Sequence, residues 1–368
     1  MTEPPEPIPH WPGKLVSLGD YQVYVRSVPD QAPEPEATST ETDPREPAPR
    51  EPALCVHGLE GSSRNWTDLI DLLRPRLVAD ALDLPGFGES PPRPDGRYSI
   101  AALAQTVIAL IERNGSGPVH LLGNSLGGAV CVKVAATRPD LIRTLTLISP
   151  ALPDARLRLD LLRFPLMSVP GVGARLLRQV QHLPPERRVA DVIATCYRDP
   201  RRFPQARLAA EVTELHRRDA LDYPAAALVG SIRALTAETL RGGGRPAWRD
   251  AALITVPTLV IYGHDDRLVD ARMAGRAAHV FQNARIVVLP STGHVAHMEH
   301  PHLVAAEIGV LLAAASQTGP TAGPTAGPTA GPTAGPTAGP TAGQTGQTGQ
   351  AQTPQAGRAR EFPLAPAG

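Results

Sequence analysis

Short apolar runs alternate with segments of helical periodicity along most of the chain. The apolar runs predict strands at 15–18, 21–26, 53–56, 77–83, 118–122, 144–148, 257–262 and 285–289. Apolar residues that recur every three or four positions predict helices at 99–113, 126–136, 270–280 and 302–315. Strands that alternate with helices are joined by right-handed crossovers, so we expect an α/β fold with a mostly parallel sheet and helices on both faces.

A different pattern occupies the middle of the chain. Residues 151–249 read as helical and rich in Arg, and prolines interrupt their periodicity. We interpret this segment as an all-helical insertion that forms a cap over the sheet. The α/β core is therefore predicted in two parts, 14–150 and 250–315.

Other segments lack the apolar side chains that a folded core needs. Residues 29–52 consist largely of Pro, Glu, Thr and Ala, so burial cannot offset the entropy lost on ordering, and we predict a disordered insert. From Gly319 the tetrapeptide Gly-Pro-Thr-Ala repeats six times. A period of four without an apolar position builds neither a solenoid nor collagen, so 316–368 are predicted to be a disordered tail. Residues 1–13 are also predicted to be disordered.

Composition narrows the classes of partner. The 36 Lys and Arg residues balance 36 Asp and Glu residues, which leaves no basic field for nucleic acid. Three cysteines are too few for a disulfide framework or a metal cluster. No run reaches the roughly 18 apolar residues of a membrane span, and the N-terminus carries Glu and Pro in place of the basic and apolar parts of a signal peptide. We therefore expect a cytoplasmic protein with no membrane span, nucleic-acid partner, cofactor or metal.

The segment Gly123-Asn124-Ser125-Leu126-Gly127 carries the strongest chemical signal. It is a G-x-S-x-G sequence between a predicted strand and a predicted helix, where this motif forms a sharp, strained turn. The turn exposes Ser125 at the carboxyl end of the sheet and places the Leu126 amide at a helix N-terminus, where it can stabilise an oxyanion. Ser125 is therefore predicted to be a nucleophile.

A serine hydroxyl needs a base to act as a nucleophile, and the base needs an acid to orient it. His294 follows a predicted strand through a Pro-Ser-Thr-Gly turn, which places it at the same sheet edge as Ser125. Asp266 follows another predicted strand at that edge. Its neighbour Asp265 is the alternative acid, but the usual spacing after the preceding glycine favours Asp266.

Two further groups of residues surround these candidates. The sequence His57-Gly58-Leu59 follows the predicted strand 53–56, and the free amide of Leu59 would join Leu126 in a two-donor oxyanion hole. His57 itself is expected to be a structural hydrogen-bonding group beneath that turn. His297, His300 and His302 follow His294 without acidic or Cys partners at metal spacing, so solvated or capping roles are favoured over metal binding.

With these elements in this order, the chain resembles the α/β-hydrolase fold superfamily, and within it the cap-bearing esterase- and lipase-like branch. The matching stretches are 57–61, 83–90, 123–128, 263–266, 293–294 and 299–301. The resemblance implies an eight-stranded, mostly parallel sheet with an antiparallel second strand and a helical cap inserted after the sixth strand. It also implies that Ser125, Asp266 and His294 form a catalytic triad, with the oxyanion hole at the Leu59 and Leu126 amides.

The same resemblance implies a serine hydrolase that cleaves a carboxylic ester or related acyl bond of a small molecule through an acyl-enzyme. Haloalkane dehalogenases and epoxide hydrolases of this fold use an Asp nucleophile, so Ser125 argues against both. Residues 124–128 resemble the elbow of carbon–carbon bond hydrolases acting on vinylogous diketo acids, although those enzymes usually have Trp where this chain has Val295. A non-catalytic ligand-binding protein is the third alternative, but such proteins usually lack a triad residue or an elbow glycine.

The cap segment 157–177 mixes large apolar side chains with Arg. We expect it to line an apolar acyl pocket, because charges recur through the segment. A weak contact between the cap and a lipid surface is the alternative.

Overall fold

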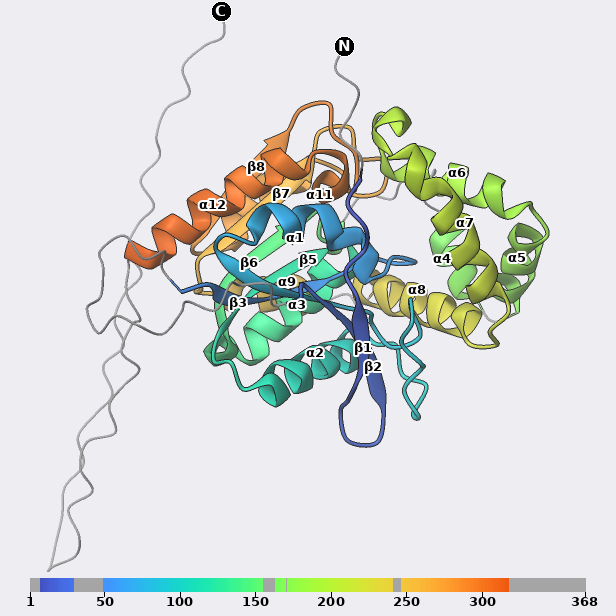
Figure 1. Cartoon of the computed structure of the whole chain (residues 1–368), viewed down its shortest axis with the longest axis horizontal. Helices are drawn as coiled ribbons and strands as arrows, with labels where there is room; N and C mark the ends of the chain where they lie inside the picture. Colours follow the sequence, from blue (N-terminus) through green and yellow to red (C-terminus); the bar gives the residue numbers. More distant parts are fainter. Residues whose placement is uncertain (1–6, 30–48, 155–162, 170, 241–245, 318–368) are drawn as a thin grey trace, which may run out of the picture. The chain divides into compact units, whose positions relative to one another are not determined.

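A computed structural model describes residues 7–29, 49–154, 163–169, 171–240 and 246–317. They contain a sheet with the strand order β1-β2-β4-β3-β5-β6-β7-β8 (Figure 1). The strands are β1 (Gly13–Ser17), β2 (Gln22–Ser27), β3 (Glu51–Val56), β4 (Leu77–Leu82), β5 (Val119–Asn124), β6 (Ile142–Ile148), β7 (Thr258–Gly263) and β8 (Ala284–Leu289). β2 is antiparallel to both of its neighbours, and β3 to β8 run parallel. The predicted eight-stranded, mostly parallel sheet is confirmed.

Side chains alternate between the two faces of the sheet, and each face buries its own layer of helices. In β3, Leu54 and Val56 belong to one buried cluster, and Ala53 and Cys55 belong to the other. The first cluster includes side chains of α2 (Ile100–Asn114), α3 (Leu126–Thr137), α9 (Pro246–Leu253) and α10 (Met273–Val280). The second includes side chains of α1 (Thr67–Leu73), α11 (Ala296–Glu299) and α12 (Pro301–Gln317). Helices therefore cover both faces, as predicted.

The predicted helical insertion follows β6. Its helices are α4 (Arg163–Ser168), α5 (Val172–Gln181), α6 (Pro185–Cys196), α7 (Gln205–Asp219) and α8 (Pro224–Leu240), with a short 3-10 helix at Pro200–Arg202. Near the predicted end of the cap at 249, Trp248 of α9 is buried in the first core cluster and donates to the Pro153 carbonyl at 2.8 Å. Residues 157–162 and 170 of the predicted pocket-lining segment 157–177 lie outside the described residues.

The described residues include parts of the segments predicted to be disordered. The predicted insert lies outside the described residues at 30–48, but its last residues belong to β3. The repeat tail lies outside them from 318 onward. Residues 7–13 make side-chain contacts with α1 and its C-terminal neighbour: His10 Nδ1 lies 2.7 Å from Thr67 Oγ1, and the Trp11 ring stacks under Arg74. These large side chains supply contacts that a Pro- and Glu-rich composition hides.

Strand register brings the predicted chemical groups to one edge. Val56 at the end of β3 lies opposite Gly123 in β5, and Gly263 at the end of β7 lies opposite Leu289 at the end of β8. The loops that follow these parallel strands therefore leave the sheet together at its carboxyl edge. Within the described ranges, no helix combines the length and hydrophobicity needed to cross a membrane.

Candidate active site

Ser125 stands at a strained turn between β5 and α3. Its φ of 52° and ψ of −115° lie where non-glycine residues are rarely found, at a cost of about 1–3 kcal/mol. The conformation is held by the Ser125 amide, which donates to the Ile148 carbonyl at 3.0 Å, and by the Ser125 carbonyl, which accepts from Ala129 at 3.1 Å. The structure thus has the sharp strand-to-helix turn that the G-x-S-x-G motif predicts.

Two glycines make this turn possible. A Cβ atom on Gly123 would lie 2.6 Å from the Gly127 carbonyl oxygen, and one on Gly127 would lie 2.2 Å from the Val56 carbonyl oxygen. Both contacts are with backbone atoms, which cannot swing aside. Gly127 lets the elbow pack directly on the end of β3, and Gly123 lets the two arms of the turn approach each other.

His294 and Asp266 form a buried pair on neighbouring loops. His294 Nδ1 lies 2.8 Å from Asp266 Oδ2, and both side chains are almost fully buried. Asp266 Oδ1 accepts hydrogen bonds from the amides of Leu268 at 2.7 Å and Val269 at 3.0 Å. Burial alone would raise the pKa of Asp266, but the charge and hydrogen bond of His294 and the two amides lower it below its ordinary value. Asp266 is thus an ionised acceptor that fixes the imidazole.

The alternative acid points elsewhere. The Asp265 carboxylate lies 2.9 Å from His264 Nδ1 and accepts from Arg198 Nε at 3.1 Å. The hydrogen bond from His264, the largest cause, lowers the pKa of Asp265. The structure therefore brings Asp266, and not Asp265, to His294.

Asn124 connects the elbow to the loop that carries His294. Its Nδ2 donates to the carbonyl oxygens of His294 at 3.2 Å and Ile148 at 3.0 Å. No hydrogen bond joins the half-buried Ser125 side chain to the His294 imidazole within the described part of the chain. Asn124 belongs to the sequence motif, but the sequence did not predict its role, because the two carbonyls that accept from it lie far away along the chain.

The turn after β3 runs beside Ser125. A Cβ on Gly58 would lie 3.1 Å from Ser125 Cβ. Fully buried His57 accepts from the Leu84 amide through Nε2 at 3.0 Å, so its proton is on Nδ1, which donates to the Gly58 carbonyl at 2.7 Å. Burial, the largest cause, lowers the pKa of His57 and keeps the ring neutral. His57 therefore fixes the turn, in the structural role predicted from the sequence.

Two backbone amides at this edge are free to donate. Among the described residues, neither Leu59 nor Leu126 donates its amide to an acceptor of the chain. The Leu126 amide opens α3, where the first amides of a helix have no partner within it. The Leu59 amide follows the Gly58 carbonyl, which accepts from both His57 and the Gly61 amide. Both unpaired donors lie on the turns that adjoin Ser125.

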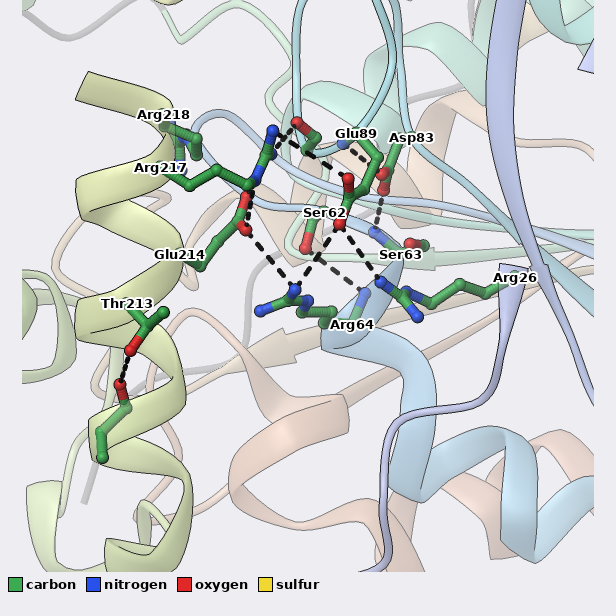
Figure 2. A network of polar contacts seen from close by, with 12 residues as sticks. Arg26, Ser62, Ser63, Arg64, Asp83, Glu89, Thr213, Glu214, Arg217 and Arg218 are labelled. Atoms are coloured by element: carbon green, nitrogen blue, oxygen red, sulfur yellow. Dashed lines mark hydrogen bonds and ion pairs between the residues drawn. The ribbon is translucent and has the colours of Figure 1, made fainter. Parts of the chain in front are cut away.

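An ionic network ties the cap to the loop after β3 (Figure 2). Buried Glu214 on α7 accepts two hydrogen bonds from Arg217, at 2.7 and 2.9 Å, and lies 3.4 Å from Arg64. Burial would raise the pKa of Glu214, but the hydrogen bonds of Arg217 and the charge of Arg64 lower it. Arg218 donates to the Glu60 carbonyl at 3.2 Å. The cap helix α7 is thereby fixed next to the residue that follows Leu59.

The other histidines near the site make separate contacts. His297 is fully buried and stacks on Trp66 with ring centroids 4.4 Å apart. Neither of its nitrogens has a hydrogen-bond partner among the residues that the structure describes. His300 Nε2 lies 3.3 Å from the Ser291 carbonyl. Across the described ranges, no three His, Cys, Asp or Glu side chains gather as metal ligands would.

Comparison with known proteins identifies a family to which this chain is similar. A family model for the alpha/beta hydrolase fold matches residues 52–301. The lipase LipV of Mycobacterium tuberculosis is 39% identical over 98 residues, which are 27% of this chain and 36% of LipV. RutD of Pseudomonas savastanoi pv. phaseolicola, provisionally assigned as a carbamate hydrolase, is 30% identical over 248 residues, which are 66% of this chain and 86% of RutD. The chain covers between about a quarter and just over a third of the length of the first curated relatives that it matches.

Solved structures share the fold. The haloalkane dehalogenase DbeA from Bradyrhizobium elkani USDA94 matches with a TM-score of 0.63 and 21% identity, over 83% of this chain and 99% of DbeA. At this identity the match establishes the architecture only. A lipase, a carbamate hydrolase and a dehalogenase are three different chemistries, so the residues at the sheet edge must decide between them.

Proposed function

Because the chain belongs to the alpha/beta hydrolase fold family, we propose that it is a serine hydrolase that cleaves a carboxylic ester or a related acyl bond. The observation that carries the proposal is the buried Asp266–His294 pair, which lies on loops at the same sheet edge as the strained Ser125 elbow. Relatives named as a lipase and an esterase support the same class of substrate.

The proposed reaction assigns one role to each group. Ser125 Oγ attacks the carbonyl carbon while its proton passes to His294 Nε2, and Asp266 holds the proton on Nδ1 and stabilises the imidazolium. The amides of Leu59 and Leu126 donate to the developing oxyanion, and each such donor contributes roughly 3–4 kcal/mol of barrier lowering. His294 then protonates the leaving alcohol, which departs and leaves Ser125 acylated.

Water completes the cycle in the same geometry. His294 takes a proton from water as the water oxygen attacks the acyl carbon. The imidazolium then gives that proton to Ser125 Oγ as the second tetrahedral intermediate collapses and the acid departs. Every step uses the same two amides and the same imidazole. No metal or cofactor is required by this route.

Replacement of Ser125 by Ala tests the proposal. We expect S125A to lose the burst of p-nitrophenol from short- and medium-chain p-nitrophenyl esters and to lose labelling by a fluorophosphonate probe. S291A is the matched control, because Ser291 is an exposed serine with a similar φ of 50° on a nearby turn, and it should retain both signals. Unchanged turnover by S125A would refute the proposal.

The substrate panel should include a vinylogous diketo acid. A carbon–carbon bond hydrolase would use the same serine and imidazole, so only the relative kcat/KM of ester and diketo acid separates the two reactions. A protein that binds these ligands but neither turns them over nor reacts with the probe would instead be a non-catalytic member of the family.

A further inference from the structure

A segment of the cap lies directly against the loop that carries His294. The His294 amide donates to the carbonyl of Cys196, the last residue of α6, at 2.7 Å. A Cβ on Gly293 would lie 2.4 Å from that same carbonyl oxygen and 2.6 Å from the Arg198 amide nitrogen. Backbone therefore packs on backbone here, and the position of His294 depends on the position of the cap segment 196–199.

Glu299 accepts hydrogen bonds from both the His294 loop and the cap segment 196–199. It ends the short helix α11, and its side chain is buried, with 2% of the residue exposed. Oε2 accepts from the amides of Gly293 at 2.7 Å and Arg198 at 3.2 Å, and Oε1 accepts from the amide of Asp199 at 2.8 Å. One carboxylate thus satisfies one amide of the His294 loop and two amides of the cap.

The same part of the cap also contacts the loop that carries Asp266. Arg198 Nε donates to Asp265 Oδ2 at 3.1 Å, and the Arg267 guanidinium donates to the Ala194 carbonyl. The end of α6 therefore borders both members of the His–Asp pair. Glu299 is the buried group that links this segment to the residue just before His294.

We propose that Glu299 is a positioning residue that holds the His294 imidazole in its reactive place by fixing both Gly293 and the cap segment 196–199. The proposal rests on the proposed function, because it assigns His294 as the base. Hydrogen bonds to an ionised acceptor are stronger and shorter than neutral ones, so three of them define one loop geometry. Without the carboxylate, three backbone amides would be buried without an acceptor, and the loop would shift to find others.

Two substitutions of Glu299 grade the effect. E299A removes all three hydrogen bonds, and we expect kcat to fall by about 10²-fold, the effect of a misplacement of about 1 Å, with KM changed less than about threefold. In E299Q, the Gln oxygen should take the Oε2 position, because two amides donate there. The Gln NH₂ group then takes the Oε1 position, where it faces the Asp199 amide and cannot accept its hydrogen bond. Its kcat should fall by about tenfold, between E299A and the wild type.

R207Q is the matched control for lost stability. Arg207 of α7 binds Asp68 at 2.6 and 2.7 Å and donates to the Ile8 carbonyl at 2.8 Å, so it also joins the cap to the core, and these hydrogen bonds go to segments other than the His294 loop. All variants should lower the Tm, and kcat is compared well below each Tm. We expect the Nδ1 proton of His294 to give a signal in the low-field region of the proton NMR spectrum. This signal should broaden or shift in the Glu299 variants and stay unchanged in R207Q.

The outcomes separate this inference from the proposed function. If S125A keeps full activity, the serine mechanism is wrong and the role of Glu299 is wrong with it. If S125A is inactive while E299Q turns over like R207Q and keeps the His294 signal, only the positioning role is overturned. If E299A does not unfold cooperatively, E299Q carries the test, and a kcat loss with a nearly constant KM and an altered signal supports the role.

Discussion

Replacing Asp266 with Asn should reverse the proton arrangement of His294. Oδ1 of Asp266 accepts from the amides of Leu268 and Val269, and Oδ2 faces His294 Nδ1. The two amides will keep the Asn oxygen at the Oδ1 position, because an NH₂ group there would oppose two donors. The Asn NH₂ must then donate to Nδ1, so the ring proton moves to Nε2, which can no longer accept the proton of Ser125.

The magnitude follows from this change of tautomer. In serine hydrolases that use a triad, an Asn in place of the acid lowers kcat by about 10⁴-fold, which corresponds to about 5 kcal/mol of barrier. D266N should therefore lose almost all p-nitrophenyl ester turnover while the fold persists, since the two backbone amides keep their acceptor. D265N is the matched control, because Asp265 pairs with His264 and Arg198 and should change kcat less than about twofold.

Steady-state kinetics and nitrogen NMR of the imidazole measure the two parts of this prediction. D266N should show His294 with its proton on Nε2, and D265N should show the wild-type pattern. A D266N enzyme within tenfold of the wild-type kcat would contradict the assigned role of the carboxylate. So would a D265N enzyme that is impaired as severely as D266N.

Two further predictions concern stability. Burial, with the charge of His294 as the smaller cause, lowers the pKa of His297 to about 3. Below pH 6.5, His297 therefore binds a proton in the unfolded chain but not in the folded chain. The free energy of unfolding therefore decreases as the pH falls, and this group accounts for about 2 kcal/mol of the decrease at pH 5. H297F keeps an aromatic ring on Trp66 and removes the titrating group, so its free energy of unfolding, measured with urea at pH 7.5 and 5, should change less with pH than that of the wild type. An unchanged pH dependence would contradict this prediction. G127A places a Cβ 2.2 Å from the Val56 carbonyl oxygen and should cost more than about 4 kcal/mol, whereas G275A, with open space around the helical glycine Gly275, should stabilise by about 0.5–1 kcal/mol. Thermal melts of the pair compare the two, and similar melting temperatures would contradict the close packing of the elbow on β3.

The sequence predicted the strands well because each is a buried apolar run between turn residues. It did not predict α1 (Thr67–Leu73), whose seven residues are too few to show a helical period. Leu69, Ile70 and Leu73 of α1 are buried against the sheet, so tertiary packing stabilises this helix. The end of the cap at 249 stays a prediction, because helical periodicity does not tell whether a helix such as α9 packs on the sheet or on the cap.

Local sequence motifs identified the candidate catalytic residues better than the residues that hold them in place. The Ser125 elbow is encoded within five residues, and the loops of Asp266 and His294 follow predicted strands. The choice of Asp266 over Asp265 depends on where each carboxylate points, and spacing alone only favoured it. Glu299 lies 100 residues or more from its partners in the cap, so no local pattern could assign its hydrogen bonds.

The cap contacts the proposed site from both sides, so in the proposed enzyme the same segments would affect both substrate choice and catalysis. On one side, the Leu59 side chain packs against Leu228 and Ile232 of α8, while its amide is a proposed oxyanion donor. On the other side, the Cys196 carbonyl accepts from the His294 amide. A cap exchanged from a relative would change the pocket and also remove these two contacts. Such an exchange should therefore lower kcat even for small esters that do not reach the cap, unless the residues that meet Leu59 and His294 are transferred unchanged.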